Sequence, residues 1–195
     1  LPPRLAPWVA GLEAQQKSLN SYGLTSTRVP GISVANYRVF QQLRDAGKAT
    51  VRYSILLRPR DLADFRASVA PSGVKPGEGD DWVRIWGIKV AVDGGFEGGL
   101  MTKPYLDPLG KNGTYYGLRL LDQPSFNEYV VTLNRAGWRS AVHAVGDAAI
   151  DQALNGYEAA NGKANQDEHP HRQASRRKRV PTACLPQHEP QVLDE

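Results

Sequence analysis

Strand-like and helical segments alternate along most of this sequence, and this alternation constrains the fold more than any other feature. Strand-like runs are expected at residues 23–31, 49–59, 82–95 and 138–147, and each is followed by apolar residues at helical spacing. Strands that alternate with helices pair in parallel through right-handed crossovers. Four such units are too few to close an eight-stranded barrel. The sequence therefore predicts an α/β fold that is either an open doubly wound sheet or part of something larger.

Apolar residues at helical spacing predict the intervening helices. We expect these helices at residues 5–19, 34–47, 60–71, 124–137 and 148–160. A long segment rich in glycine and proline, residues 94–117, precedes the fourth helix and could cover a pocket. The run 82–95 is apolar on both alternating faces, which is typical of a strand covered on both sides.

The composition is that of an ordinary globular protein. Hydrophobic residues make up 41% of the 195 residues and charged residues 23%, and the length fits one domain. The one cysteine, Cys184, excludes an internal disulfide and any cysteine-based zinc site. No apolar run approaches the roughly 18 residues of a membrane span, and the first residues lack the pattern of a secretory signal. We therefore expect a cytoplasmic protein with no membrane partner.

The last part of the chain differs in composition from the rest. Residues 163–195 have no apolar period, several prolines and a basic run at 176–179. Low apolar content cannot offset the entropy of ordering, so we expect a disordered tail, unrelated to the domain of residues 1–162. The basic run has no interleaved aromatic residues, and the net charge of +4 is mild. Neither feature indicates nucleic acid as a partner.

His143 lies at the end of the last strand-like run, directly before a helix. In parallel α/β folds, ligands bind at the carboxyl ends of the strands. An imidazole at that place can hold a metal ion through a neutral ring nitrogen or act as an acid or base. The alternative is a core histidine that is hydrogen-bonded to a backbone carbonyl.

Lys89 is the only charged residue between Arg84 and Asp93, inside a run that should be buried. Burying an ammonium without a partner is costly and favours the neutral amine. A neutral lysine amine can take up carbon dioxide, and the resulting carbamate can bridge two metal ions. The alternatives are that Lys89 extends toward the strand end or pairs with Asp93.

Two further charged residues are candidates for the site. Asp147 precedes the last helix and is well placed as its N-cap, a role that is compatible with catalytic or second-layer support at a pocket rim. Arg28 lies at the end of another strand-like run, where it could bind an anionic group of the substrate. A surface ion pair is the alternative for Arg28.

Three phrases, in this order, resemble the amidohydrolase-3 family of metal-dependent hydrolases: GLTSTRVPG, IKVAVDGGFEGGLMTKPY and GWRSAVHAVGDAAIDQALNGYEAAN. The resemblance implies an incomplete (β/α)8 barrel of TIM type, with the second to fifth strands present. It implies that His143 is the metal-binding histidine of the fifth strand. It also implies that Lys89 is the fourth-strand lysine, often carboxylated, that bridges two metals. The expected cofactor is a divalent metal, zinc by preference, as one or two ions, and the expected substrates are small molecules with amide-like carbon–nitrogen bonds.

The sequence also departs from the family pattern. The first-strand His-x-His pair, the sixth-strand histidine and the eighth-strand aspartate are absent, and His169, His171 and His188 lie in tail sequence that does not match. A catalytic metal needs three or four protein ligands. We therefore expect the isolated chain to be inactive: it is either an incomplete amidohydrolase-like hydrolase or a truncated remnant with no catalytic function of its own.

Overall fold

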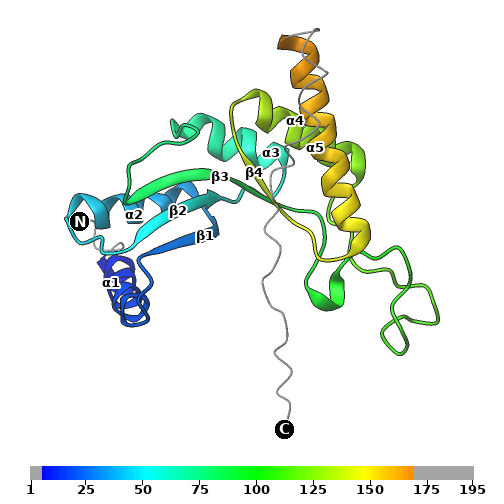
Figure 1. The fold of residues 1–195 in the computed structure, drawn as a ribbon, viewed down its shortest axis with the longest axis horizontal. Helices are drawn as coiled ribbons and strands as arrows, with labels where there is room; N and C mark the ends of the chain where they lie inside the picture. Colours follow the sequence, from blue (N-terminus) through cyan, green and yellow to red (C-terminus); the bar gives the residue numbers. More distant parts are fainter. Residues whose placement is uncertain (1–5, 169–195) are drawn as a thin grey trace.

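Four parallel strands form one sheet in the order β1-β2-β3-β4 (Figure 1). The computed structural model describes residues 6–168. The strands are β1 (Ser26–Ile32), β2 (Arg52–Leu57), β3 (Val83–Ala91) and β4 (Ser140–His143). Consecutive strands are neighbours throughout, so the α/β fold with parallel pairing that the alternation predicts is confirmed. Within the described part of the chain, β1 and β4 are the edges of the sheet.

Five α-helices connect or flank the strands: α1 (Ala6–Ser21), α2 (Val34–Asp45), α3 (Leu62–Asp64), α4 (Gln123–Arg135) and α5 (Asp147–Glu168). The predicted helix 60–71 is a short α-helix that continues as a π turn and a 3₁₀ turn, and the ring of Pro71 cannot extend an α-helical pattern. Helix α5 extends past the predicted end at residue 160. The predicted disordered tail lies, from residue 169 onward, outside the described residues.

Local capping explains where two of the helices begin. The Ser33 hydroxyl accepts the backbone N–H of Asn36 and starts α2, and the Asp122 carboxylate accepts the N–H of Ser125 and starts α4. Both helices present an apolar face to the sheet, and α4 packs against α5. Among the helices of residues 6–168, we find none with the length and apolar character that a bilayer span requires.

The two sides of the sheet differ in burial. On β3, Ile85, Ile88 and Val90 are buried under the helices, whereas Trp86 and Lys89 are only partly buried. The prediction that this strand is covered on both sides is therefore wrong for the part of the chain that the structure describes. The described helices cover one side of the sheet and leave the other side open.

A bulge in β3 places Lys89 on the open side. The register between β2 and β3 shifts between Ile55 and Leu56, and β3 has one extra residue there. In a regular strand, side chains would alternate from Trp86 onward, so Ile88 rather than Lys89 would lie on the open side. The bulge therefore decides which side of the sheet carries the lysine.

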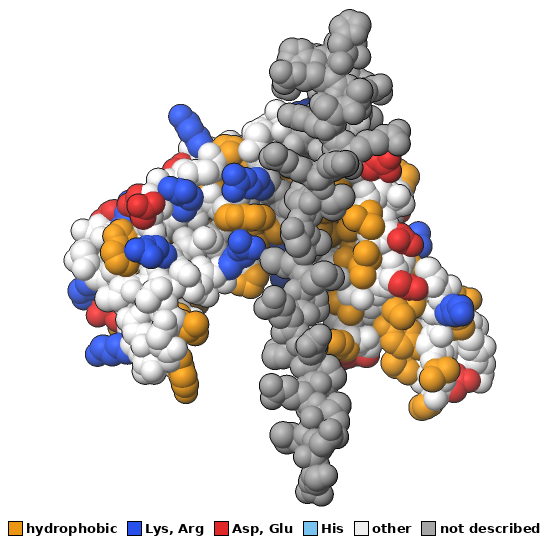
Figure 2. All heavy atoms as spheres, in the orientation of Figure 1, with side chains coloured by type: hydrophobic (Ala, Val, Ile, Leu, Met, Phe, Trp, Pro, Cys, Tyr) orange, Lys and Arg blue, Asp and Glu red, His pale blue; other side chains and the backbone are white. Residues whose placement is uncertain are grey.

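The open side is basic and aromatic near the amino ends of the strands. Figure 2 shows Lys and Arg side chains beside hydrophobic ones over this region. The guanidinium carbon of Arg28 lies 4.3 Å from the centre of the Trp86 ring, and that of Arg139 lies 5.8 Å from it. Such stacking is a favourable cation–π arrangement on an exposed surface. This half of the open face therefore does not have the apolar character of a buried protein core.

Candidate metal centre

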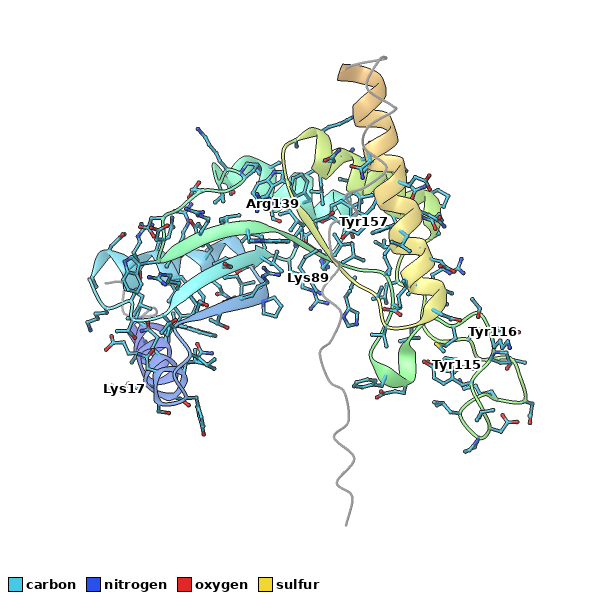
Figure 3. The ribbon with its side chains drawn as sticks, in the orientation of Figure 1. Lys17, Lys89, Tyr115, Tyr116, Arg139 and Tyr157 are labelled. Atoms are coloured by element: carbon cyan, nitrogen blue, oxygen red, sulfur yellow. The ribbon has the colours of Figure 1, made fainter. Side chains whose placement is uncertain are left out.

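Lys89 and His143 lie on adjacent strands and on the same side of the sheet. Lys89 is paired in register with Ala141, and Ala91 is paired with His143. His143 is therefore two residues further along β4 than the partner of Lys89, and side chains two apart share a face. Strand spacing and rise put the two Cα atoms about 8 Å apart. Figure 3 labels Lys89 where β3 runs beside β4.

A buried carboxylate joins the loops that follow these two strands. The Asp93 side chain has no exposed surface, and its Oδ2 accepts three backbone N–H groups, from Leu100 (3.0 Å), Val145 (3.0 Å) and Gly146 (2.8 Å). Its Oδ1 also lies 3.1 Å from the Val145 nitrogen. We call this arrangement the Asp93 junction. It fixes the turn that leads from His143 into α5.

The hydrogen bond of His143 defines which ring nitrogen is free for a ligand. Its Nε2 lies 3.0 Å from the carbonyl oxygen of Gly94 and 4.0 Å from Oδ1 of Asp93. Because a carbonyl only accepts, this contact favours the proton on Nε2, and in the neutral ring the lone pair is then on Nδ1. The side chain is 40% exposed, so a ligand can reach it. A backbone carbonyl is also the usual outer partner of a metal-binding histidine, so the geometry is compatible with both predicted roles.

The glycine that follows His143 is required by close packing. A Cβ at Gly146 would lie 1.9 Å from the carbonyl oxygen of Leu100 and 2.3 Å from its carbonyl carbon. Any larger residue would push the β4–α5 turn away from the loop that contains Leu100. The phrase HAVGD thus combines one candidate ligand with the backbone that holds it in place.

Asp147 ties the same loop to the first turn of α5. Its two carboxylate oxygens accept the backbone N–H of Thr102 (2.8 Å) and the Thr102 hydroxyl (2.5 Å). These bonds, the hydroxyl first, lower the pKa of the Asp147 carboxyl. The predicted capping is limited to the adjacent N–H of Ala148, at 2.8 Å, while the N–H of Ala149 donates to the carbonyl of Leu100. Asp147 therefore supports the loop beside the candidate site.

The loop between β3 and α4 is braced by two tyrosine hydroxyls. The Tyr105 hydroxyl lies 2.9 Å from the carbonyl oxygen of Phe96 and 2.8 Å from that of Gly99. The hydroxyl of Tyr115, labelled in Figure 3, donates to the carbonyl of Glu97 at 2.8 Å. Phe96 itself is 92% exposed on this braced turn. The segment predicted as a long glycine- and proline-rich loop is therefore an ordered element next to the carboxyl ends of β3 and β4.

The register does not bring Arg28 to this end of the sheet. Arg28 is the third residue of β1 and lies level with Ser54 and Arg84. Lys89 is five residues further along β3 than Arg84, or about 16 Å at the usual strand rise. The guanidinium of Arg28 stacks on Trp86 instead. Its predicted contact with a substrate group remains a prediction.

Sequence reasoning did not assign the two residues that organise this region. The sequence indicates Asp93 only as a possible partner for Lys89, and it indicates no role for Thr102. An acidic residue at the exit of an apolar strand was the available signal, but its donors are 7 to 53 residues away in sequence. Within residues 6–168 no group of three or more His, Cys, Asp or Glu side chains could hold a metal ion. Of the residues predicted to bind a metal, His143 and Lys89 lie on one side of adjacent strands.

Comparison with known proteins identifies the family. The family model described as the amidohydrolase family matches residues 8–182 of this chain. The chain belongs to the amidohydrolase family. The resemblance inferred from its three sequence phrases is thereby confirmed. The match extends 20 residues beyond residue 162, the predicted end of the domain.

Two solved structures are similar to this amidohydrolase-family chain over most of its length. An uncharacterized metal-dependent hydrolase from Pyrococcus furiosus is 25% identical, with a TM-score of 0.65 over 80% of this chain and 32% of that one. A second uncharacterized metal-dependent hydrolase, from Pyrococcus horikoshii OT3, is 23% identical and has a similar fold, with a TM-score of 0.63 over 79% and 30%. Protein LONG AFTER FAR-RED 3 of Arabidopsis thaliana is 32% identical over 87 residues. That match covers 42% of this chain and 14% of the plant protein.

Proposed function

We propose that this chain is the metal-binding section of a hydrolase that cleaves non-peptide carbon–nitrogen bonds in small amide-like molecules. The observation that carries the proposal is the placement of Lys89 and His143 on one side of adjacent strands, near their carboxyl ends. Ligand sites of parallel α/β folds occupy this position. The family membership and the metal-dependent structural relatives support the same chemistry.

In this proposal His143 binds a divalent ion, zinc by preference, through Nδ1, while Nε2–H stays on the Gly94 carbonyl. Lys89 in its neutral form adds carbon dioxide: its nitrogen bonds to the carbon, loses a proton and becomes a carbamate with two ligand oxygens. A bound ion supplies a nucleophile from water at neutral pH and polarises the carbonyl that is attacked. The Asp93 junction and Asp147 hold the backbone around the two donors.

The remaining ligands would come from further strands that complete a (β/α)8 barrel over the open side of the sheet. The chain spans 32% and 30% of the two structural relatives, so the whole relatives contain enough chain to cover such a side. The absence of nucleic acid and membrane partners and the cytoplasmic location stay predictions.

A second candidate is an inactive remnant of such an enzyme. It is favoured by the donor set, because the described residues offer two donors where a catalytic metal needs three or four protein ligands. The two candidates differ in whether the 195-residue chain hydrolyses anything, and they agree on where a metal would contact it.

Calorimetric titration of the 195-residue chain with Zn²⁺, with and without bicarbonate, tests the proposal. We expect His143→Ala to weaken Zn²⁺ binding at least about tenfold, because it removes the imidazole ligand. We expect Lys89→Met to abolish any gain from bicarbonate, because it removes the amine that forms the carbamate. Lys48→Met, which changes an exposed lysine elsewhere, serves as the matched control.

Equal Zn²⁺ affinity of the wild type and His143→Ala would contradict the proposal, since binding would then come from other residues. A panel of amides, ureas and cyclic amides separates the two candidates. Hydrolysis that is lost in His143→Ala supports the enzyme. Zinc binding through His143 without any hydrolysis supports the remnant.

A further inference from the structure

We propose that Asp93 is the positioning residue for His143, and that its carboxylate selects the ring tautomer that leaves Nδ1 for a ligand. This inference rests on the proposed function for its metal, but its geometric part stands on the described contacts alone. Three backbone N–H groups converge on one buried carboxylate, and two of them belong to the turn directly after His143.

The chain of contacts from Asp93 to the imidazole is short on both sides. On one side, Val145 and Gly146 donate to the carboxylate and follow His143 by two and three residues. On the other side, Gly94 follows Asp93 directly, and its carbonyl oxygen lies 3.0 Å from Nε2 of His143. The carboxylate thus holds both the backbone that carries the imidazole and the carbonyl that it contacts.

The carboxylate also acts on the imidazole directly through its charge. Oδ1 lies 4.0 Å from Nε2, so a protonated Nε2 faces a negative group and a carbonyl dipole together. An unprotonated Nε2 would direct its lone pair at both acceptors. Both contacts therefore favour Nε2–H, which is the tautomer that keeps Nδ1 available.

An isosteric amide cannot replace this carboxylate. Oδ2 accepts three N–H groups, and Oδ1 also faces the Val145 nitrogen. In either orientation of an asparagine at this position, its NH₂ group would oppose a backbone N–H. Asp93→Asn keeps the size of the side chain and removes the function that we assign to it.

The experiment is a ¹⁵N NMR determination of the His143 tautomer at pH 8, together with Zn²⁺ titration of the same samples. His143→Ala identifies which of the four histidine rings belongs to His143. We expect a single Nε2–H form in the wild type and a mixture of tautomers in Asp93→Asn. We expect Zn²⁺ affinity in Asp93→Asn to fall about 10- to 100-fold, the usual cost of losing an outer partner of a metal ligand.

Asp122→Asn is the matched control, because Asp122 accepts the N–H of Ser125 at the start of α4 and has no observed contact to His143. It should leave the tautomer and the Zn²⁺ affinity within about twofold of the wild type. An unchanged tautomer in Asp93→Asn, or an equal change in Asp122→Asn, overturns the inference.

Two measurements still test the inference if Asp93→Asn does not fold or if Zn²⁺ does not bind. The wild-type tautomer needs no variant: an Nδ1–H form in the folded wild type overturns the inference even if Asp93→Asn does not fold. The tautomer also needs no metal. If Zn²⁺ does not bind through His143, the proposed function fails while the effect of Asp93 on the ring is still decided.

Discussion

Two buried polar side chains hold loops to this sheet, one at each end of the molecule, and they use different chemistry. Near β1 and β2, the amide of Gln16 from α1 accepts the N–H groups of Thr50 (2.6 Å) and Val51 (3.1 Å) and donates to the carbonyl of Lys48. Near β3 and β4, the carboxylate of Asp93 accepts three N–H groups and donates nothing. Both residues are almost fully buried, at 2% and 1% exposure.

The difference shows that docking a loop does not by itself require a buried charge. A neutral amide serves at the Gln16 end, where the backbone offers both donors and an acceptor. At the Asp93 end only donors converge, and an imidazole lies 4.0 Å away. A buried carboxylate is costly unless it is fully hydrogen-bonded. The three N–H donors of Asp93 meet this condition. The following changes test the contrast between the two ends.

The largest expected contrast is between two glycines, one at each end. Gly146→Ala should destabilise the fold by about 4 kcal/mol, because its Cβ would lie 1.9 Å from a backbone oxygen. Gly11→Ala, within α1, meets nothing within 4 Å and should stabilise the chain by roughly 0.5–1 kcal/mol. Urea unfolding of both variants measures the two effects. A loss below about 1 kcal/mol for Gly146→Ala would show that the β4–α5 turn can move freely.

Truncating the two polar side chains should cost unequal amounts. Asp93→Ala strands three N–H groups and should cost about 3 kcal/mol, whereas Gln16→Ala strands two and should cost about 2 kcal/mol. Chemical denaturation at pH 7 provides the comparison. Only Asp93→Ala should also change the His143 ring signals, and a change of equal size in Gln16→Ala would remove the distinction between the two ends.

Acid should weaken the contacts that Asp147 makes at the Asp93 end. The Thr102 hydroxyl and N–H lower the pKa of Asp147 in the folded chain, so its stabilising effect is present above the unfolded pKa of about 3.9 and is lost as the pH falls through the folded value. The stability difference between wild type and Asp147→Asn should therefore shrink between pH 5 and pH 3. Gln16 does not titrate, so the difference between wild type and Gln16→Ala should stay nearly constant. Denaturation series at several pH values measure both, and equal slopes would contradict the assignment.

The smallest effect is expected for an ion pair at the Gln16 end. Lys48 and Glu13 lie 2.8 Å apart, but their side chains are 53% and 36% exposed. Water screens such a pair, so Lys48→Met should change the stability by no more than about 0.5 kcal/mol. Thermal melting of this variant gives the baseline for the larger effects. A loss above about 1 kcal/mol would mean that this end also relies on charge.

Local periodicity was enough to predict the elements and their parallel pairing. The four strand-like runs, the helices around them and the strand-end position of His143 all follow from residue spacing within short windows. The side of the sheet on which Lys89 lies did not follow, because one extra residue in β3 changes the alternation after Trp86. The same bulge explains why apolar residues occupy both alternating positions of this strand although the described helices cover only one side of the sheet.

By itself, the sequence determined the order of strands and helices and the family, and it proposed Lys89 and His143 as the two donor side chains. Only the tertiary structure decided that Asp93 joins two loops and faces His143, since the backbone groups it accepts lie 7, 52 and 53 residues further along the chain. The physical reason is that hydrophobic periodicity acts over a few residues and leaves a signature in the sequence. Every residue except proline has a backbone N–H, so the sequence does not mark which of these groups will converge on a buried carboxylate.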